Sequence, residues 1–359
     1  MKASSKDNKW QIIRGISVIF VILIHVQTAA PYRSGSFDHI SWVVLRQIIN
    51  CAVPLFFFMS GFFTKEEYFR DGKSMIAYWK TKGLRLIVPF LIWSFVYSIV
   101  GIITSGSALS FGMAAKWAAK MLSGQAEQQL YFVFVLIQLK LLTPLLIRVR
   151  RSAAAKAVTG IIFALWIGAY YISRLGIVRL PDFFSFKIVF LSWMPYYILG
   201  MAARERRNAA PRPKTAVLAA LTLAAFMLAL CEDFFWYKEG MDVSFQVSQM
   251  KLTNYAYGVL ACLTAFAAVR GSKKAASGPL SRALTALGND SYGIFYVHCL
   301  FVPAVDRLLS LIGFNAPEVT FPLIAIIKLV SVLLLSVLLV RLVKLAAKRT
   351  KLPDLLGFN

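Results

Sequence analysis

Two ionisable side chains, Arg14 and His25, lie within the first long apolar run of the chain. Such residues are costly to bury in a membrane, so they commonly mark a functional site. They are eleven residues apart, so on one α-helix they share a face and are separated by about 16 Å along the axis. A neutral imidazole can accept a proton from a hydroxyl group, and a guanidinium binds anionic groups. The pair therefore predicts a site with a cation near one end of the helix and a base deeper within it.

Each of the two residues also has a purely structural interpretation. Arg14 can be a cation that extends to the membrane surface and sets the topology. His25 can be a hydrogen-bonding group that holds two helices together. Two unrelated structural roles would not require the residues to share a face, so we favour the functional interpretation.

A second, weaker set of polar groups lies further along the chain. Ser291 and His298 are seven residues apart in the ninth apolar run and share a helix face, which suggests substrate contacts. Asp290, beside them, is expected to begin that helix as part of its N-terminal cap. Glu232 and Asp233, at the end of the seventh run, are candidates for binding a polar acceptor, or are solvated helix-end charges.

The elements that position these residues are predicted to be transmembrane helices. Hydrophobic residues make up 58% of the 359 residues and charged residues only 16%, against about 25% charged in typical soluble domains. A helix crosses the membrane with roughly 20 apolar residues. We therefore predict an all-α integral membrane protein, residues 1–359 forming a single domain, with about ten helices. Their expected positions are 10–30, 41–63, 84–104, 129–147, 157–173, 188–203, 215–235, 252–269, 284–304 and 321–343.

The net charge of +24 comes from short clusters of Lys and Arg between the predicted helices, so it does not indicate nucleic-acid binding. With the N-terminus placed in the cytoplasm, 27 Lys and Arg residues fall in the predicted inner segments and 9 in the outer ones. Positive charge is enriched on the cytoplasmic side of membrane proteins. The distribution predicts that both termini are cytoplasmic in a multi-pass protein of the cell membrane.

The four cysteines, Cys51, Cys231, Cys262 and Cys299, lie in or beside apolar segments. They have no paired spacing, so we expect neither a disulfide framework nor a metal site.

Six segments, in order along nearly the whole chain, resemble the membrane acyltransferase-3 family. They read RGISVIFVILIH (14–25), VPLFFFMSGFF (53–63), KGLRLIVP (82–89), LYFVFVLIQLKLLTPL (130–145), WMPYYILG (193–200) and LGNDSYGIFYVH (287–298). The fourth block of the family often begins with a His and a Trp. This chain has Gln129 and Tyr131 there, so a role of that His does not carry over.

The resemblance implies transfer of an acyl group, commonly acetyl, from cytoplasmic acyl-CoA to a hydroxyl of an envelope or exported carbohydrate. Acyl-CoA is then a donor substrate, and no cofactor is permanently bound. The anionic phosphates of CoA would need cations at the inner face, where Arg14, Lys80, Lys82 and Arg85 cluster. His25 would act either as general base or as the acceptor in an acyl-His intermediate. We expect a polar path from Arg85 past Arg14 to His25.

A transporter or flippase for a glycan precursor is the alternative. About ten helices with polar groups inside the membrane are compatible with it. Inverted repeats with broken helices would favour a transporter, and the sequence has no evident internal repeat.

Overall fold

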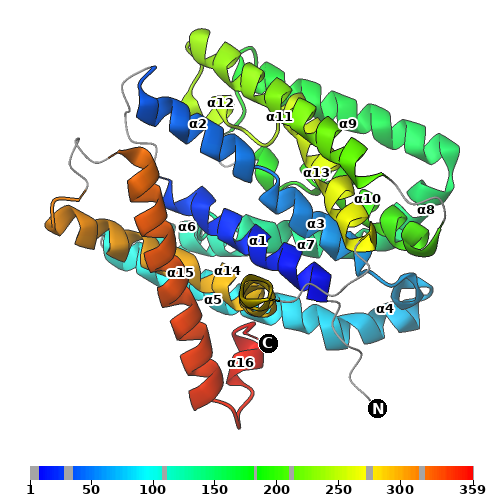
Figure 1. Cartoon of the computed structure of the whole chain (residues 1–359). Coiled ribbons are helices and arrows are strands. Elements are labelled where there is room, and N and C mark those ends of the chain that lie inside the picture. The colour runs from blue at the N-terminus through cyan, green and yellow to red at the C-terminus, as the bar shows by residue number, and fades with distance from the viewer. Residues whose placement is uncertain are drawn as a thin grey trace.

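The chain folds as a bundle of helices, which Figure 1 shows in a computed structural model. The structure describes residues 8–27, 35–106, 111–181, 184–209, 214–271, 278–314 and 320–358, and these ranges contain no β-strand. The α-helices are α1 (Asn8–Val26), α2 (Phe37–Ile49), α3 (Ala52–Phe62), α4 (Gly72–Tyr78), α5 (Leu84–Ser105), α6 (Phe111–Leu122), α7 (Tyr131–Leu141), α8 (Thr143–Arg151), α9 (Ala153–Arg174), α10 (Met194–Glu205), α11 (Thr215–Lys238), α12 (Val243–Gln246), α13 (Leu252–Gly271), α14 (Pro279–Leu311), α15 (Phe321–Ala346) and α16 (Leu352–Leu355). Short helical turns connect some of them: η1 (Glu66–Phe69), η2 (Trp79–Gly83), η3 (Phe186–Ile188), η4 (Phe190–Ser192) and η5 (Arg206–Asn208).

Eight helical stretches among the described residues are long and apolar enough to cross a membrane. A ninth is possible if α7 and α8, which meet at an angle of 62°, together form one span. The eight are α1, α2 with α3, α4 with η2 and α5, α9, α11, α13, α14 and α15. The predicted class, an all-α protein with many membrane-spanning helices, is confirmed.

The difference from the expected ten spans lies near residues 188–203. Only the 12-residue α10 is regular there, and the 3₁₀ turns η3 and η4 precede it. Side chains close these turns, because the Ser192 hydroxyl donates to the Phe186 carbonyl (2.8 Å) and the Trp193 indole to the Lys187 carbonyl (2.9 Å). Pro195 in the first turn suits a helix start.

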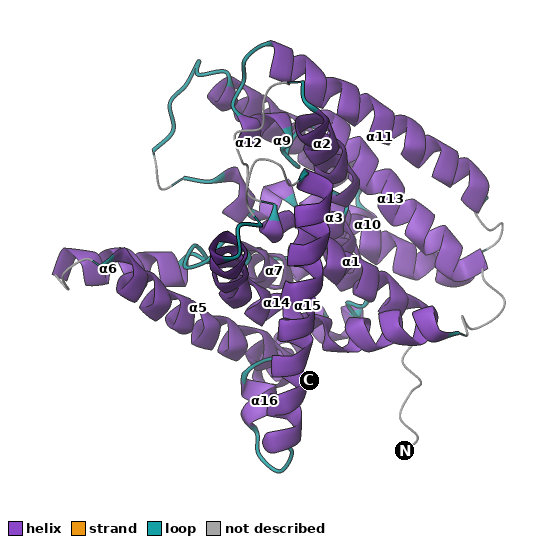
Figure 2. Ribbon diagram, turned by 60° about the vertical axis from the view of Figure 1, so that its left-hand side comes forward, coloured by secondary structure: helices purple, strands orange, loops and turns teal. Residues whose placement is uncertain are grey.

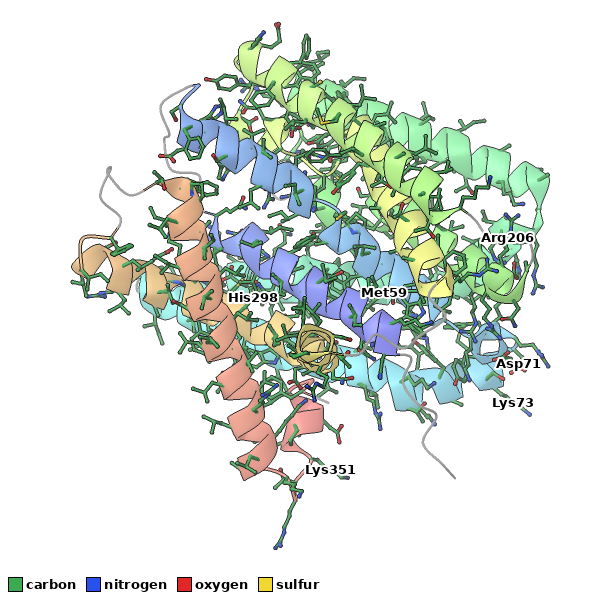
Figure 3. All side chains as sticks on the ribbon, in the orientation of Figure 1. Met59, Asp71, Lys73, Arg206, His298 and Lys351 are labelled. Carbon is green, nitrogen blue, oxygen red and sulfur yellow. The ribbon has the colours of Figure 1, made fainter. Side chains whose placement is uncertain are left out.

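Side chains join the helix ends at two opposite faces of the bundle. On one face, Arg150 at the end of α8 pairs with Glu66 and with Glu205 at the end of α10. On the other, the Asp38 carboxylate at the start of α2 accepts from the Phe321 backbone amide at the start of α15 (2.9 Å). This arrangement matches helices that alternate in direction. Figure 3 labels four polar residues at the periphery of the bundle. Asp71, Lys73 and Arg206 lie toward the face of the α8 and α10 ends, and Lys351 lies beside α16.

Helix α3 lies at the centre and packs closely against α10. A Cβ atom on Gly61 would lie 2.0 Å from the Tyr197 carbonyl oxygen, and one on Gly200 2.0 Å from the Phe58 carbonyl oxygen. Only glycine permits such an approach, which is a common way for helices to associate within membranes. The glycines of the predicted second and sixth apolar runs therefore serve helix packing.

Candidate functional site

Two helices, α1 and α14, bring the predicted site residues together. Gly15 and Gly288 allow their backbones to touch, because a Cβ atom on Gly15 would lie 2.2 Å from the Leu284 carbonyl oxygen. Ten residues further along each helix, the rings of His25 and His298 have centroids 5.1 Å apart. The two helices therefore run in the same direction, and they hold the two imidazoles side by side. Figure 2 labels both helices within a bundle made of helices and loops.

His25 lines a cavity of about 350 Å³ that lies at the predicted outer half of the bundle. Residues from α1, α2, α3, α7 and α14, the segment before α7, η3 and the turn before α13 form its wall. The polar groups among them are His25, Arg46, Gln125, Glu127, Gln128, Gln129, Tyr131, Ser185, Lys187 and Gln249.

Arg14 lines a second cavity, of about 250 Å³, together with Ser60, Ser291 and Tyr292. Its guanidinium carbon lies 5.1 Å from the centre of the Phe63 ring, a distance typical of cation–π contact. The predicted pair thus lies on one helix, as expected from its spacing, with one residue in each cavity.

Three phenylalanines, Phe56, Phe132 and Phe295, line both cavities and so stand between them. The ring of Phe132 packs edge-on against Phe56 (5.9 Å between centroids) and Phe295 (5.4 Å). Aromatic side chains therefore lie between Arg14 and His25, where the sequence predicted a polar path.

The imidazole of His25 forms no hydrogen bond with the described part of the chain, whereas His298 is fully buried and held on both sides. A carbonyl oxygen only accepts, so the contact of His298 Nδ1 with the Ile294 carbonyl (3.2 Å) places the proton on Nδ1. Nε2 of the neutral ring then accepts from the Cys299 thiol (3.3 Å). Figure 3 shows His298 in the interior of the bundle. His25 is thus the imidazole with nitrogen atoms available to a substrate.

His25, His298 and Cys299 are also a group that could ligate a metal ion, since their ligand atoms lie within 4.8 Å of one another. The cysteine spacing gave no sign of this cluster, because the three residues come from two distant segments. The hydrogen bonds of His298 already engage both of its ring nitrogens and the thiol. Two of its three members, His298 and Cys299, are therefore already engaged by hydrogen bonds, whereas His25 is not.

Comparison with protein families supports the resemblance read from the sequence. The family model described as an acyltransferase domain, that of acyltransferase-3, matches residues 7–341. The chain belongs to this family. It is a multi-pass membrane acyltransferase, and the matched range contains both cavities. No curated protein and no solved structure matches the chain.

Three cavity residues of the acyltransferase were not assigned to the site from the sequence. Arg46 lies on α2, Lys187 on η3 between α9 and α10, and Gln129 just before α7. Desolvation by the surrounding protein atoms, followed by the positive charges of Arg46 and Arg174, lowers the pKa of Lys187 from 10.5 to about 8. The Gln129 side chain is 1% exposed, and neither polar atom of its amide has a hydrogen-bond partner. In local sequence, Lys187 is an ordinary loop lysine and gives no signal that it lines this cavity.

The other predicted cations of the acyltransferase lie apart from both cavities. Lys80, Lys82 and Arg85 are exposed near the start of α5 and line neither cavity. The Lys82 ammonium donates to the Tyr68 hydroxyl (2.6 Å). They can act only on a donor group that remains outside the bundle, whereas Arg14 faces its interior.

Of the weaker candidates, Ser291 lies in the Arg14 cavity and His298 beside His25, but Glu232 and Asp233 lie elsewhere. Asp233 forms a buried ion pair with Lys251. The Glu232 carboxylate accepts from the Tyr171 hydroxyl (2.7 Å) and the Trp236 indole (3.0 Å). The contacts with Lys251 and Tyr171 tie α11 to neighbouring segments, and neither Glu232 nor Asp233 lines the cavity of His25.

Proposed function

We propose that this acyltransferase moves an acyl group, acetyl in the simplest case, from cytoplasmic acyl-CoA to a hydroxyl of an envelope or exported carbohydrate. The observation that carries the proposal is the pair of cavities on one helix, with Arg14 in one and His25 in the other. A donor with an anionic head and a long, thin arm fits a cation at one end and a base about 16 Å away. In this proposal the thin arm passes between the three phenylalanines that line both cavities, and the bulky head stays on the side of Arg14.

The reaction needs only groups that line the two cavities. The hydroxyl oxygen of the acceptor attacks the thioester carbonyl carbon while His25 takes the hydroxyl proton. The carbon–sulfur bond then breaks, and His25 returns the proton to the leaving thiolate. The products are an acyl ester of the acceptor and free CoA, and His25 ends in its starting state. An acyl-His25 route would instead release CoA before the acceptor binds.

Replacement of Arg14 by glutamine is expected to raise the KM for acetyl-CoA. A hydrogen bond to a charged group contributes about 1.5–3 kcal/mol, which corresponds to a factor of roughly 10 to 150. The measurement is the initial rate of CoA release against acetyl-CoA concentration. Lys73→Gln, which removes an exposed charge on α4, is the matched control and should leave this KM unchanged. An unchanged KM in the Arg14 variant would remove this residue from the donor site.

The test of the function is sidedness in proteoliposomes. Acetyl-CoA is added to the face that carries Arg14, and methyl α-D-glucoside and methyl α-D-glucuronoside are enclosed on the other face. We expect free CoA on the first side and acetylated glycoside on the second, both dependent on His25. Glycoside that crosses the membrane chemically unchanged, without CoA release, would instead identify a transporter.

A further inference from the structure

The outer cavity carries two cationic side chains that have no acidic partner. Arg46 and Lys187 both line it, and neither forms a salt bridge with a carboxylate of the described residues. Arg46 makes one hydrogen bond, from Nη1 to the Ile24 carbonyl (3.1 Å), and its Nε is buried without a partner. A guanidinium has five N–H donors, so four of those of Arg46 have no acceptor among the described residues.

The charge of the cavity wall favours an anion. Glu127 is the one carboxylate among its lining residues, and that carboxylate accepts from the Gln128 backbone amide (2.9 Å). With His25 neutral, two cations and one anion leave a net charge of +1. Arg46 is half-buried and Lys187 is exposed in the protein alone. Unpaired cations within a membrane domain characteristically mark substrate sites.

A further observation at the same cavity points to a polar ligand. The Gln129 amide is 1% exposed and lines the cavity, but both its oxygen and its nitrogen lack hydrogen-bond partners. Buried polar groups are nearly always hydrogen-bonded, so an unpaired amide calls for a partner that is absent from the protein itself. A carbohydrate hydroxyl satisfies both atoms, because it donates and accepts.

We propose that the acceptor is an anionic carbohydrate whose carboxylate or phosphate group is bound by Arg46 and Lys187, so that a neighbouring hydroxyl lies at His25. The proposal rests on the function proposed above and adds the chemical class of its acceptor. Gln129 contributes a hydrogen bond to a sugar hydroxyl. Arg46 and Lys187 are binding residues, and they select the acceptor by its charge.

The phosphates of CoA are a poorer match for these cations. The donor's anionic head is assigned to the side of Arg14, and three phenylalanines separate that cavity from the outer one. Contact of Arg46 with the thioester oxygen during the reaction is a second possible use of its charge. That role would lower kcat with every acceptor, whereas binding of an anionic acceptor changes KM for anionic acceptors only.

The experiment uses the full-length protein in detergent with acetyl-CoA and three acceptors. These are methyl α-D-glucuronoside, methyl α-D-glucoside 6-phosphate and the neutral methyl α-D-glucoside. We expect at least one anionic glycoside to have a KM about tenfold or more below that of the neutral one, which is the effect of one charge-assisted contact. The preferred anion tells a carboxylate acceptor from a phosphate acceptor. Equal KM values for all three would overturn the proposal and leave the acyltransferase function standing.

Variants assign the selectivity to the two cations. Arg46→Gln and Lys187→Gln should each raise the KM for the preferred anionic glycoside about tenfold or more, with little change for the neutral one. Arg46→Lys, which retains the charge, should keep the preference. Lys116→Gln removes an exposed charge on α6 and serves as control. Equal losses with charged and neutral acceptors would contradict a role in acceptor selection.

Binding is measured separately from turnover, so that the two proposals can fail independently. The thermal unfolding midpoint of the protein is recorded with each glycoside in the absence of acetyl-CoA, since a ligand that binds the folded state raises it. The preferred anionic glycoside should raise the midpoint of the wild type and not that of Arg46→Gln. If this shift occurs but no glycoside is acetylated, the protein binds an anionic carbohydrate as proposed, and the proposed acetyl transfer is wrong. If no anionic glycoside shifts the midpoint or reacts preferentially, the acceptor class is wrong.

Discussion

Replacement of His25 by alanine is expected to reduce acetyl transfer by at least about 100-fold, the lower end of what a positioned general base contributes. The imidazole lines the outer cavity and forms no hydrogen bond with the described residues, so its removal leaves no other imidazole facing the acceptor. His298 cannot take over, because its ring nitrogens are engaged by Ile294 and Cys299. The measurement is acetyl transfer to a glycoside by purified protein, at saturating acetyl-CoA.

His39 provides the matched control for this variant. It is buried on α2, where its ring lies 4.4 Å from that of Tyr237, and it lines neither cavity. His39→Gln should therefore retain turnover, while His25→Ala should retain the elution volume and thermal midpoint of the wild type. Turnover near the wild-type rate in folded His25→Ala would remove His25 from the reaction.

The local periodicity of the chain was sufficient to place Arg14 and His25. Both lie on one uninterrupted helix, α1, so a spacing of eleven residues determines their shared face. The same is true of Ser291 and His298 on α14. The assignment to integral membrane proteins also followed from composition, because apolar runs of this length are typical of transmembrane helices.

Features that depend on contacts between distant segments could not be predicted. The outer cavity combines Arg46, Gln129 and Lys187 from three elements, and only their packing shows that they face His25. Asp290 was expected at a helix start, but α14 begins at Pro279, and the Asp290 carboxylate pairs with Lys344 (2.7 Å) on α15. A carboxylate that joins two helices cannot be distinguished from a capping residue in one sequence.

The stretch near 188–203 is less regular than the predicted helix for a related reason. Its apolar composition resembles a span, but hydrogen bonds from Ser192 and Trp193 close it into short turns before α10 begins. These turns bring Lys187 to the wall of the cavity. A continuous helix through this stretch would not bend the backbone toward the cavity. The irregular backbone thus occurs where it lines a cavity, which is where membrane proteins tolerate it.

Substitution of Gly288 by alanine is expected to be severely destabilising and to abolish transfer as well. The new Cβ atom would lie 1.9 Å from the Gln11 carbonyl oxygen, a backbone atom that cannot rotate away. Helices α1 and α14 must then separate, at a cost of about 1–3 kcal/mol or more by analogy with overpacked cores. Separation also moves His298 away from His25, because this contact fixes how the two helices cross. The readouts are the thermal midpoint in detergent and the rate of acetyl transfer.

Gly160 on α9 isolates the effect of close packing from that of helix propensity. A Cβ atom there meets nothing within 4 Å, so Gly160→Ala adds the same methyl group to an open helix face. Alanine is favoured over glycine in a helix by about 0.5–1 kcal/mol, and this variant should be as stable as the wild type or more so. The two substitutions are therefore expected to change stability in opposite directions, and the backbone contact at Gly288 alone accounts for the difference. Equal stability of both variants would mean that α1 and α14 do not approach as closely as Gly15 and Gly288 allow, and the pairing of His25 with His298 would lose its basis.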